Sequence, residues 1–232
     1  MKGGTSMSDF NWHSEAKRQW DERADSWNQS SQSMWDSGSR STILPFFQKH
    51  VPSGASVLDV GCGDGYATYK LSQAGYTAYG TDLSERMIEM AKERGNMKGL
   101  SFVQADLARL PFEAESFDSI IAINSLEWTE RPLEAWIEVN RVLKPGGYAC
   151  VAILGPTAMP RINSYRRLYG ESVICNTMMP WEFKKLATEN GFIPLDGQGV
   201  YKREVKEQHL HGLSEELKQS LAFLWTFMMK KK

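Results

Sequence analysis

The chain has 232 residues, and its 27 lysines and arginines nearly balance 28 aspartates and glutamates, which leaves a formal net charge of −1. This length fits one domain with an elaboration and allows a sizeable buried core. The near-zero charge indicates no dominant electrostatic attraction to nucleic acid or to an anionic membrane, so neither is expected as a partner.

Cysteine usage and hydropathy indicate the cellular location and exclude some classes of site and segment. Cys62, Cys150 and Cys175 are too few and too scattered for a disulfide framework or a zinc site, which predicts a cytoplasmic location and no metal centre. No secretory signal follows Met1, and no apolar run reaches the ~18 residues that a membrane span needs. Residues 1–6, which precede a second methionine, are expected to be a leader and carry no weight in the interpretation.

The first 50 residues predict a helical lid, residues 1–50, in front of a core domain, residues 51–232. A helix over 12–28 is indicated by apolar residues that recur every three or four positions, namely Ala16, Trp20, Ala24 and Trp27. The serines at 30–33 should end this helix, and a second one should cover 40–50. Trp20 and Trp27 either pack against the core or close over a bound ligand.

Strands and helices alternate from residue 56 onward. The pattern predicts strands over 57–60, 76–80, 100–104, 117–123 and 148–154, with helices over 66–74, 85–94 and 132–141. Such alternation requires crossover connections and therefore a parallel sheet with helices on both faces. Ligands in these sheets bind beyond the carboxyl ends of the strands, where the strand order reverses.

The remaining sequence departs from this rhythm. Residues 156–179 are polar and basic and predict an insertion with a short helix placed above the ligand site. A helix over 181–190 and a strand over 192–201 follow. The apolar run at 221–229 would be apolar on all sides as a helix, so a buried strand is favoured.

One stretch, Val57 to Tyr66, combines a buried strand, a glycine turn and the start of a helix. Glycines at 61, 63 and 65 allow backbone dihedrals that a Cβ forbids and let a ligand approach closely. The dinucleotide fingerprint G-x-G-x-x-G requires a small residue where Tyr66 stands. Asp59, just before the turn, suits a ligand with a positive group better than a diphosphate.

Two further acids follow strand ends. Asp82 lies 21 residues after Gly61, the distance at which an acid accepts hydrogen bonds from ribose hydroxyls. Asp106 follows the third strand and could accept from an adenine amino group. Asp82 could also merely help begin the helix capped by Ser84, and Asp106 could be a simple loop acid.

The motifs D-V-G-C-G-D-G at 59–65, S-F-D-S-I-I-A-I-N-S at 116–125 and L-K-P-G-G at 143–147, together with the two acids, occur in a characteristic order. This series resembles class I S-adenosylmethionine-dependent methyltransferases, in particular the lidded enzymes that act on small molecules. The resemblance covers about 57–154 well and 181–192 more loosely. It implies an α/β, Rossmann-like, doubly wound sheet of seven strands, order 3-2-1-4-5-7-6, whose antiparallel last strand is the run at 221–229.

The same resemblance implies where S-adenosyl-L-methionine binds. Its methionine part is expected at the glycine turn and beneath the lid, its ribose at Asp82, and its adenine at Asp106, with Asn124 and Ser125 lining the passage to the methyl group. The residues implied in cofactor binding are Trp27, Arg40, Asp59, Gly61, Cys62, Gly63, Asp82, Leu83, Met87, Asp106, Leu107, Asn124 and Ser125.

The methyl acceptor is expected to be a small molecule enclosed by the lid and the insertion. Glu127 and Trp128, just beyond the fourth strand, and Tyr165 and Arg166, in the insertion, are the candidate substrate contacts. No residue is identified as a general base, because Trp128 stands near where many relatives carry a histidine.

Three other functions stay open. A nicotinamide-dependent oxidoreductase is disfavoured by Tyr66 and by the lack of a Tyr-x-x-x-Lys pair after the fourth strand. A non-catalytic cofactor-binding protein and a protein or RNA methyltransferase would share the same cofactor motifs. The sequence assigns no oligomeric state.

Overall fold

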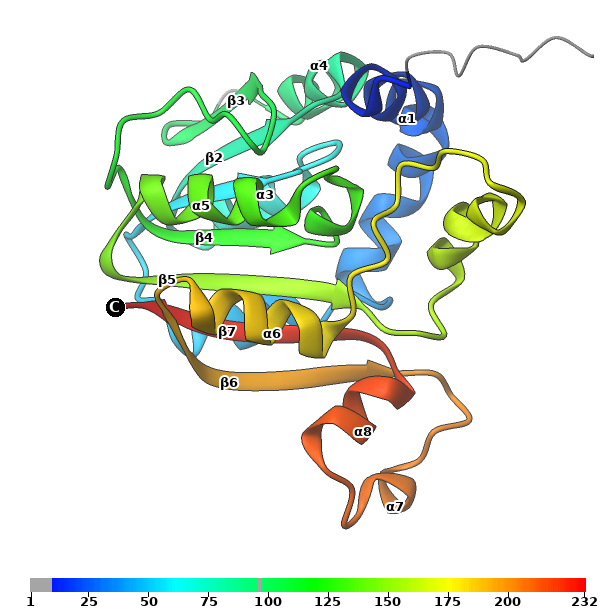
Figure 1. Cartoon of the computed structure of the whole chain (residues 1–232). Coiled ribbons are helices and arrows are strands. Elements are labelled where there is room, and N and C mark those ends of the chain that lie inside the picture. The colour runs from blue at the N-terminus through cyan, green and yellow to red at the C-terminus, as the bar shows by residue number, and fades with distance from the viewer. Residues whose placement is uncertain (1–9, 96) are drawn as a thin grey trace, which may run out of the picture.

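The computed structural model describes residues 10–95 and 97–232, so the expected leader at 1–6 lies outside the described residues. One seven-stranded sheet runs through the described chain in the order β3-β2-β1-β4-β5-β7-β6 (Figure 1). β7 is antiparallel to β5 and β6, while the other neighbours are parallel. This confirms the predicted strand order. The strands are β1 Ser56–Val60, β2 Thr77–Asp82, β3 Leu100–Gln104, β4 Phe117–Ile123, β5 Leu143–Leu154, β6 Phe192–Tyr201 and β7 Ala222–Lys231.

Helices cover both faces of the sheet. The helices are α1 Trp12–Asp36, α2 Ile43–Gln48, α3 Tyr66–Gln73, α4 Glu85–Glu93, α5 Pro132–Val142, α6 Pro180–Glu189, α7 Glu207–Leu210 and α8 Glu215–Leu221, with 3₁₀ helices η1 Leu126–Trp128 and η2 Met159–Tyr169. On one face Trp136 of α5 and Phe183 of α6 pack edge to face at 5.0 Å. On the other face α2 and α3 bury Phe47 and Leu71.

The apolar run at the C-terminus forms β7, as predicted. Its side chains alternate between the two cores: Phe227 joins the α5 and α6 side, whereas Met228 joins the α2 and α3 side. Both faces of β7 are covered by these cores, and both edges pair with strands, so an uninterrupted apolar sequence is stable as a strand.

The prediction that the serines at 30–33 end the first helix is wrong, because α1 continues to Asp36. The Ser30 and Ser33 hydroxyls donate to carbonyls three or four residues earlier in the helix, so they are satisfied without leaving it. Ser31 is buried and donates to Asp64 Oδ1 at 2.8 Å. The serines therefore let the helix pack closely on the glycine turn.

The loops that follow the parallel strands all open at one edge of the sheet, and α1 and η2 lie at this edge beyond the arrowheads of β4 and β5 (Figure 1). α1 contacts α4, where the Asp21 carboxylate accepts a hydrogen bond from Ser84 Oγ at 2.6 Å. Across residues 10–95 and 97–232, no helix has both the length and the apolar character to cross a membrane.

Candidate functional site

The glycine turn after β1 is tightly enclosed. Gly61, Gly63 and Gly65 have φ of +73°, +55° and +75°, in the left-handed region that favours glycine. A Cβ on Gly61 would lie 2.4 Å from Ser125 Cβ, and one on Gly63 would lie 3.0 Å from the Trp27 indole nitrogen. The turn therefore passes between the end of β4 and the lid helix with no room for side chains.

Asp82 lies at the end of β2 and connects the glycine turn to the next helix. Its Oδ2 accepts from Gly63 N at 2.8 Å and its Oδ1 accepts from Ser84 N at 2.9 Å. Loss of hydration raises the pKa of Asp82 to about 6, although the two backbone N–H groups favour the ionised form. The carboxylate thus fixes both loops while facing the cavity described below.

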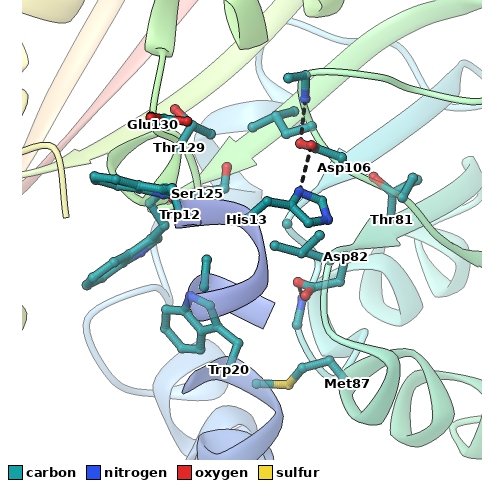
Figure 2. Close-up of a pocket in the computed structure, with 18 of the residues that line it drawn as sticks. Trp12, His13, Trp20, Thr81, Asp82, Met87, Asp106, Ser125, Thr129 and Glu130 are labelled. Atoms are coloured by element: carbon teal, nitrogen blue, oxygen red, sulfur yellow. Dashed lines mark hydrogen bonds and ion pairs between the residues drawn. The ribbon is translucent and has the colours of Figure 1, made fainter. Parts of the chain in front are cut away.

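Asp106, which follows β3, meets the lid helix. Its Oδ2 lies 3.0 Å from His13 Nδ1, and its Oδ1 accepts from Ala108 N at 2.9 Å. Figure 2 shows the His13 ring projecting from α1 into the space between Asp106 and Asp82. The two acids and the lid histidine therefore come from three elements and share one space.

That space is a cavity of about 400 Å³, within the usual range for small-molecule sites. The strand ends, the start of α4 and the lid line it together. Ten of the thirteen expected cofactor residues contribute to its wall: Trp27, Gly61, Gly63, Asp82, Leu83, Met87, Asp106 and Leu107, with Asn124 and Ser125 from the end of β4.

The end of β4 holds Asn124 in an unusual backbone conformation, with φ of +53°. Its side-chain Oδ1 accepts from Arg40 Nη2 at 3.3 Å, and its carbonyl accepts from the Trp128 indole N–H at 2.8 Å. The buried Ser125 Oγ, by contrast, has no hydrogen-bond partner in the described residues. A strained residue beside an unpaired hydroxyl at the cavity wall is typical of a ligand-binding position.

Three of the expected cofactor residues lie behind the wall instead of on it. Asp59 is buried and accepts from the Thr68 hydroxyl at 2.7 Å, and burial raises the pKa of Asp59 to about 7. Arg40 lies with its guanidinium carbon 4.6 Å from the centre of the Trp27 ring, and burial lowers the pKa of Arg40 to about 10. Cys62 is also buried, which raises the pKa of its thiol.

Of the four candidate substrate residues, only Trp128 lines the cavity. Glu127 is fully buried, where its Oε1 accepts from Leu154 N at 2.7 Å, and burial raises its pKa. Its Oε2 has no partner in the described residues. Tyr165 and Arg166 lie on η2 with exposed side chains, outside the cavity wall, and Arg166 pairs with Glu171.

The lid contributes aromatic side chains that sequence reasoning assigned only in part. The Trp20 ring packs edge to face against Trp27 at 5.7 Å and against Trp128 at 5.2 Å. Trp12, which was not predicted, donates its indole N–H to the Trp128 carbonyl at 2.8 Å and lines the cavity. Continuing the apolar stripe four residues back from Ala16 would have found Trp12, but no sequence signal pointed to His13.

Comparison with known proteins adds independent information. Residues 58–151 match the family described as Methyltransferase domain. Over 179 residues the chain is 30% identical to the biotin biosynthesis bifunctional protein BioHC of Teredinibacter turnerae, covering 71% of this chain and 31% of that protein. Over 109 residues it is 40% identical to phthiotriol/phenolphthiotriol dimycocerosates methyltransferase 1 of Mycobacterium ulcerans, covering 45% of this chain and 40% of that protein. The chain thus spans well under half the length of these two relatives.

A solved structure, an S-adenosylmethionine-dependent methyltransferase from Thermotoga maritima, superposes with a TM-score of 0.66 at 21% identity, over 92% of this chain and 98% of that one. At this identity the likeness establishes the fold alone, and it agrees with the strand order above. Residues 58–151 thus match a methyltransferase domain, and the chain shares the fold of a solved S-adenosylmethionine-dependent methyltransferase.

Proposed function

We propose that this protein transfers the methyl group of S-adenosyl-L-methionine to a small-molecule acceptor by in-line displacement at the sulfonium methyl. The observation that carries the proposal is that Asp82 and Asp106, from neighbouring strand ends, line one cavity together with the glycine turn and the end of β4. Such a set offers acceptors for ribose and adenine and a close backbone approach for the methionine part.

The described residues fit this cofactor. Asp82 would accept from the ribose hydroxyls, since each of its oxygens keeps a lone pair beyond its single backbone N–H. Asp106 would accept from the adenine amino group, and Leu83, Met87 and Leu107 would flank the ring. The Trp27 ring would attract the cationic end through cation–π attraction, and that cation would in turn favour the ionised form of Asp59 behind the wall.

The sulfonium group supplies an already activated methyl when it is bound, so the protein has mainly to orient the acceptor and exclude water. Orientation of this kind can lower a barrier by about 7–11 kcal/mol. The lid aromatics Trp12 and Trp20, together with Trp128 of η1, would exclude water, while Asn124 and Ser125 would direct the acceptor toward the methyl group. We assign no general base, and an acceptor that is already ionised would need none.

The small-molecule acceptor is supported by two features. The lid helix forms one wall of the cavity, as suits a ligand that is held largely within the protein. One relative above is named as a methyltransferase of phthiotriol and phenolphthiotriol dimycocerosates, which are neither proteins nor nucleic acids, and the other is named for biotin biosynthesis. Cytoplasmic location, predicted from the cysteines, stays a prediction.

Calorimetric titration with S-adenosylhomocysteine and, separately, with NAD⁺ tests the cofactor. We expect binding of the first only, and binding of NAD⁺ alone would indicate an oxidoreductase. Incubating the protein with methyl-labelled donor and a cell extract, then fractionating by size, tests the acceptor. Label in the small-molecule fraction supports the proposal. Label in protein or RNA would overturn the acceptor class, and cofactor binding without transfer to any fraction would indicate a non-catalytic protein.

A further inference from the structure

The 3₁₀ helix η2 carries the most exposed large apolar side chains of residues 10–95 and 97–232. Met159, Ile162 and Leu168 are 77%, 70% and 69% exposed, and Tyr165 is 48% exposed. Single exposed apolar residues are ordinary on a protein surface, whereas a contiguous group marks an interaction site.

The spacing of these residues makes them contiguous. A 3₁₀ helix has three residues per turn, so side chains three apart lie in one line. Met159, Ile162, Tyr165 and Leu168 are spaced by three along η2 and form a line that we term the apolar ridge. Runs of 3₁₀ helix longer than about four residues are uncommon, and η2 has 11.

The other sides of η2 are anchored, which fixes the direction of the apolar ridge. Arg161 donates from Nε to the Gly155 carbonyl at 2.7 Å and from Nη2 to the Met178 carbonyl at 2.9 Å, and Ser164 is buried. Asn163 accepts from Arg23 of the lid helix at 3.2 Å. These contacts hold η2 to the segment just after β5, to the segment before α6 and to α1, beside which η2 lies in Figure 1. The exposure of its four residues shows that the ridge faces away from the protein.

Basic and aromatic polar groups accompany the apolar ridge. Arg166 stacks its guanidinium 4.6 Å from the Tyr169 ring and pairs with Glu171. Arg167 follows Ser164 by three residues, at the end of the anchored side of η2, and donates to Ser164. Arg167 is nevertheless exposed and forms no ion pair with any acid in the part of the chain that the structure describes. Apolar side chains with arginine and tyrosine at their border are typical of the interface between lipid headgroups and acyl chains.

The shape decides among occupants. A small molecule needs a concave site, but the ridge projects outward from an anchored helix. A lipid surface deforms around such a projection, and an anionic one complements Arg167. We propose that the apolar ridge docks this protein onto an anionic lipid surface, with Ile162 and Leu168 among the headgroups and acyl-chain ends and Arg167 at the phosphates.

This docking is a surface contact, and no membrane-crossing segment is invoked. The small net charge of the whole chain, from which no anionic membrane partner was expected, gives little long-range attraction. The proposed contact departs from that expectation because it depends on local apolar burial. Because η2 adjoins the lid, docking would bring the cavity-bearing edge of the sheet to the lipid. The inference goes beyond the proposed function and does not require it.

Co-sedimentation of the full chain with vesicles tests the proposal. We expect binding to vesicles of phosphatidylcholine with about one third phosphatidylglycerol, and weaker binding to phosphatidylcholine alone. The Ile162→Ser/Leu168→Ser variant should lose about tenfold or more in vesicle affinity, because two large aliphatic groups leave the interface. Arg167→Gln should weaken binding to the anionic vesicles alone.

The matched control is Ile137→Ser/Leu217→Ser, which replaces the same two residue types, each 53% exposed, on α5 and α8. This control should bind vesicles like the unmodified chain, and both double variants should keep their affinity for S-adenosylhomocysteine. Absence of vesicle binding, or equal binding by the ridge variant, would overturn the proposal. So would a dimer in light scattering that the ridge variant alone abolishes, because the ridge would then face a second copy. Failure to bind S-adenosylhomocysteine would instead count against the proposed function.

Discussion

The ends of β1, β2 and β3 differ from the ends of β4 and β5 in how completely their polar groups are paired. In the first region, both oxygens of Asp82 and of Asp106 have hydrogen-bond partners. In the second, the buried atoms Ser125 Oγ, Glu127 Oε2 and Arg161 Nη1 have none among the described residues. We infer that the first region is already organised for its ligand, whereas the second presents one unpaired hydroxyl at the cavity wall, that of Ser125, and holds the unpaired atoms of Glu127 and Arg161 behind that wall.

The largest effect is expected from a substitution that disrupts the contact between the two regions. Gly61→Ala would place a Cβ 2.4 Å from Ser125 Cβ at a φ of +73°. We expect a loss of about 3–5 kcal/mol in unfolding free energy, from overpacking added to left-handed strain. Urea unfolding measures it, with Gly54→Ala as the control, because Gly54 has a φ of +87° with nothing within 4 Å. Equal costs for the two variants would show that the close approach of the β1 and β4 loops is unimportant.

Asp82→Ala tests the organised region directly. It removes a charged acceptor from the cavity and leaves Gly63 N and Ser84 N without their partner. We expect affinity for S-adenosylhomocysteine to fall about 100-fold by calorimetry, since hydrogen bonds to charged groups contribute ~1.5–3 kcal/mol each. Asp196→Ala, on the distant β6, should bind normally. Unchanged affinity in a folded Asp82→Ala protein would remove the ribose assignment.

Asp59→Asn tests whether the buried Asp59 behind the cavity wall titrates near neutral pH. Burial raises the pKa of Asp59 to about 7, above the ~3.9 of an unfolded aspartate. The folded chain therefore holds a proton that unfolding releases, so this residue makes stability fall as pH rises from about 4 to about 7. The free energy of unfolding of the variant should exceed that of the unmodified chain by roughly 1 kcal/mol or more at pH 8, and by much less at pH 5. A gap that is the same at both pH values would contradict a buried, titrating Asp59.

The smallest effects are expected where the lid meets Asp106. The His13 side chain is 53% exposed and the Asp106 side chain is 38% exposed, so solvent screens the interaction between them. We expect a coupling below ~1 kcal/mol in a double-mutant cycle of His13→Ala and Asp106→Ala measured on S-adenosylhomocysteine affinity. Asp106→Ala alone should weaken binding about tenfold, because it also loses the adenine contact. A coupling as large as the Asp82→Ala effect would mean that the lid contact dominates this side of the cavity.

Much of the fold was predictable because apolar runs and turn residues, which lie close together in the sequence, decide where most helices and strands begin and end. Strand boundaries at 100–104 and 117–123 were predicted as the structure has them, since apolar runs and adjacent turns decide them. β5 begins earlier than expected, at Leu143, because Phe117 pairs with Leu143 before a register shift in β4. That pairing joins strands 26 residues apart, and no local pattern reports it.

The sequence by itself determined the alternating β/α order, the glycine turn, the positions of Asp82 and Asp106 at strand ends and the nature of β7. Periodicity and the chemistry of individual residues suffice for these features. Only the tertiary structure decided that Asp59 and Arg40 lie behind the cavity wall, that His13 meets Asp106 across 93 residues, and that the apolar ridge of η2 faces outward. Those outcomes depend on which surfaces pack together, and packing is fixed by contacts between segments far apart in the chain.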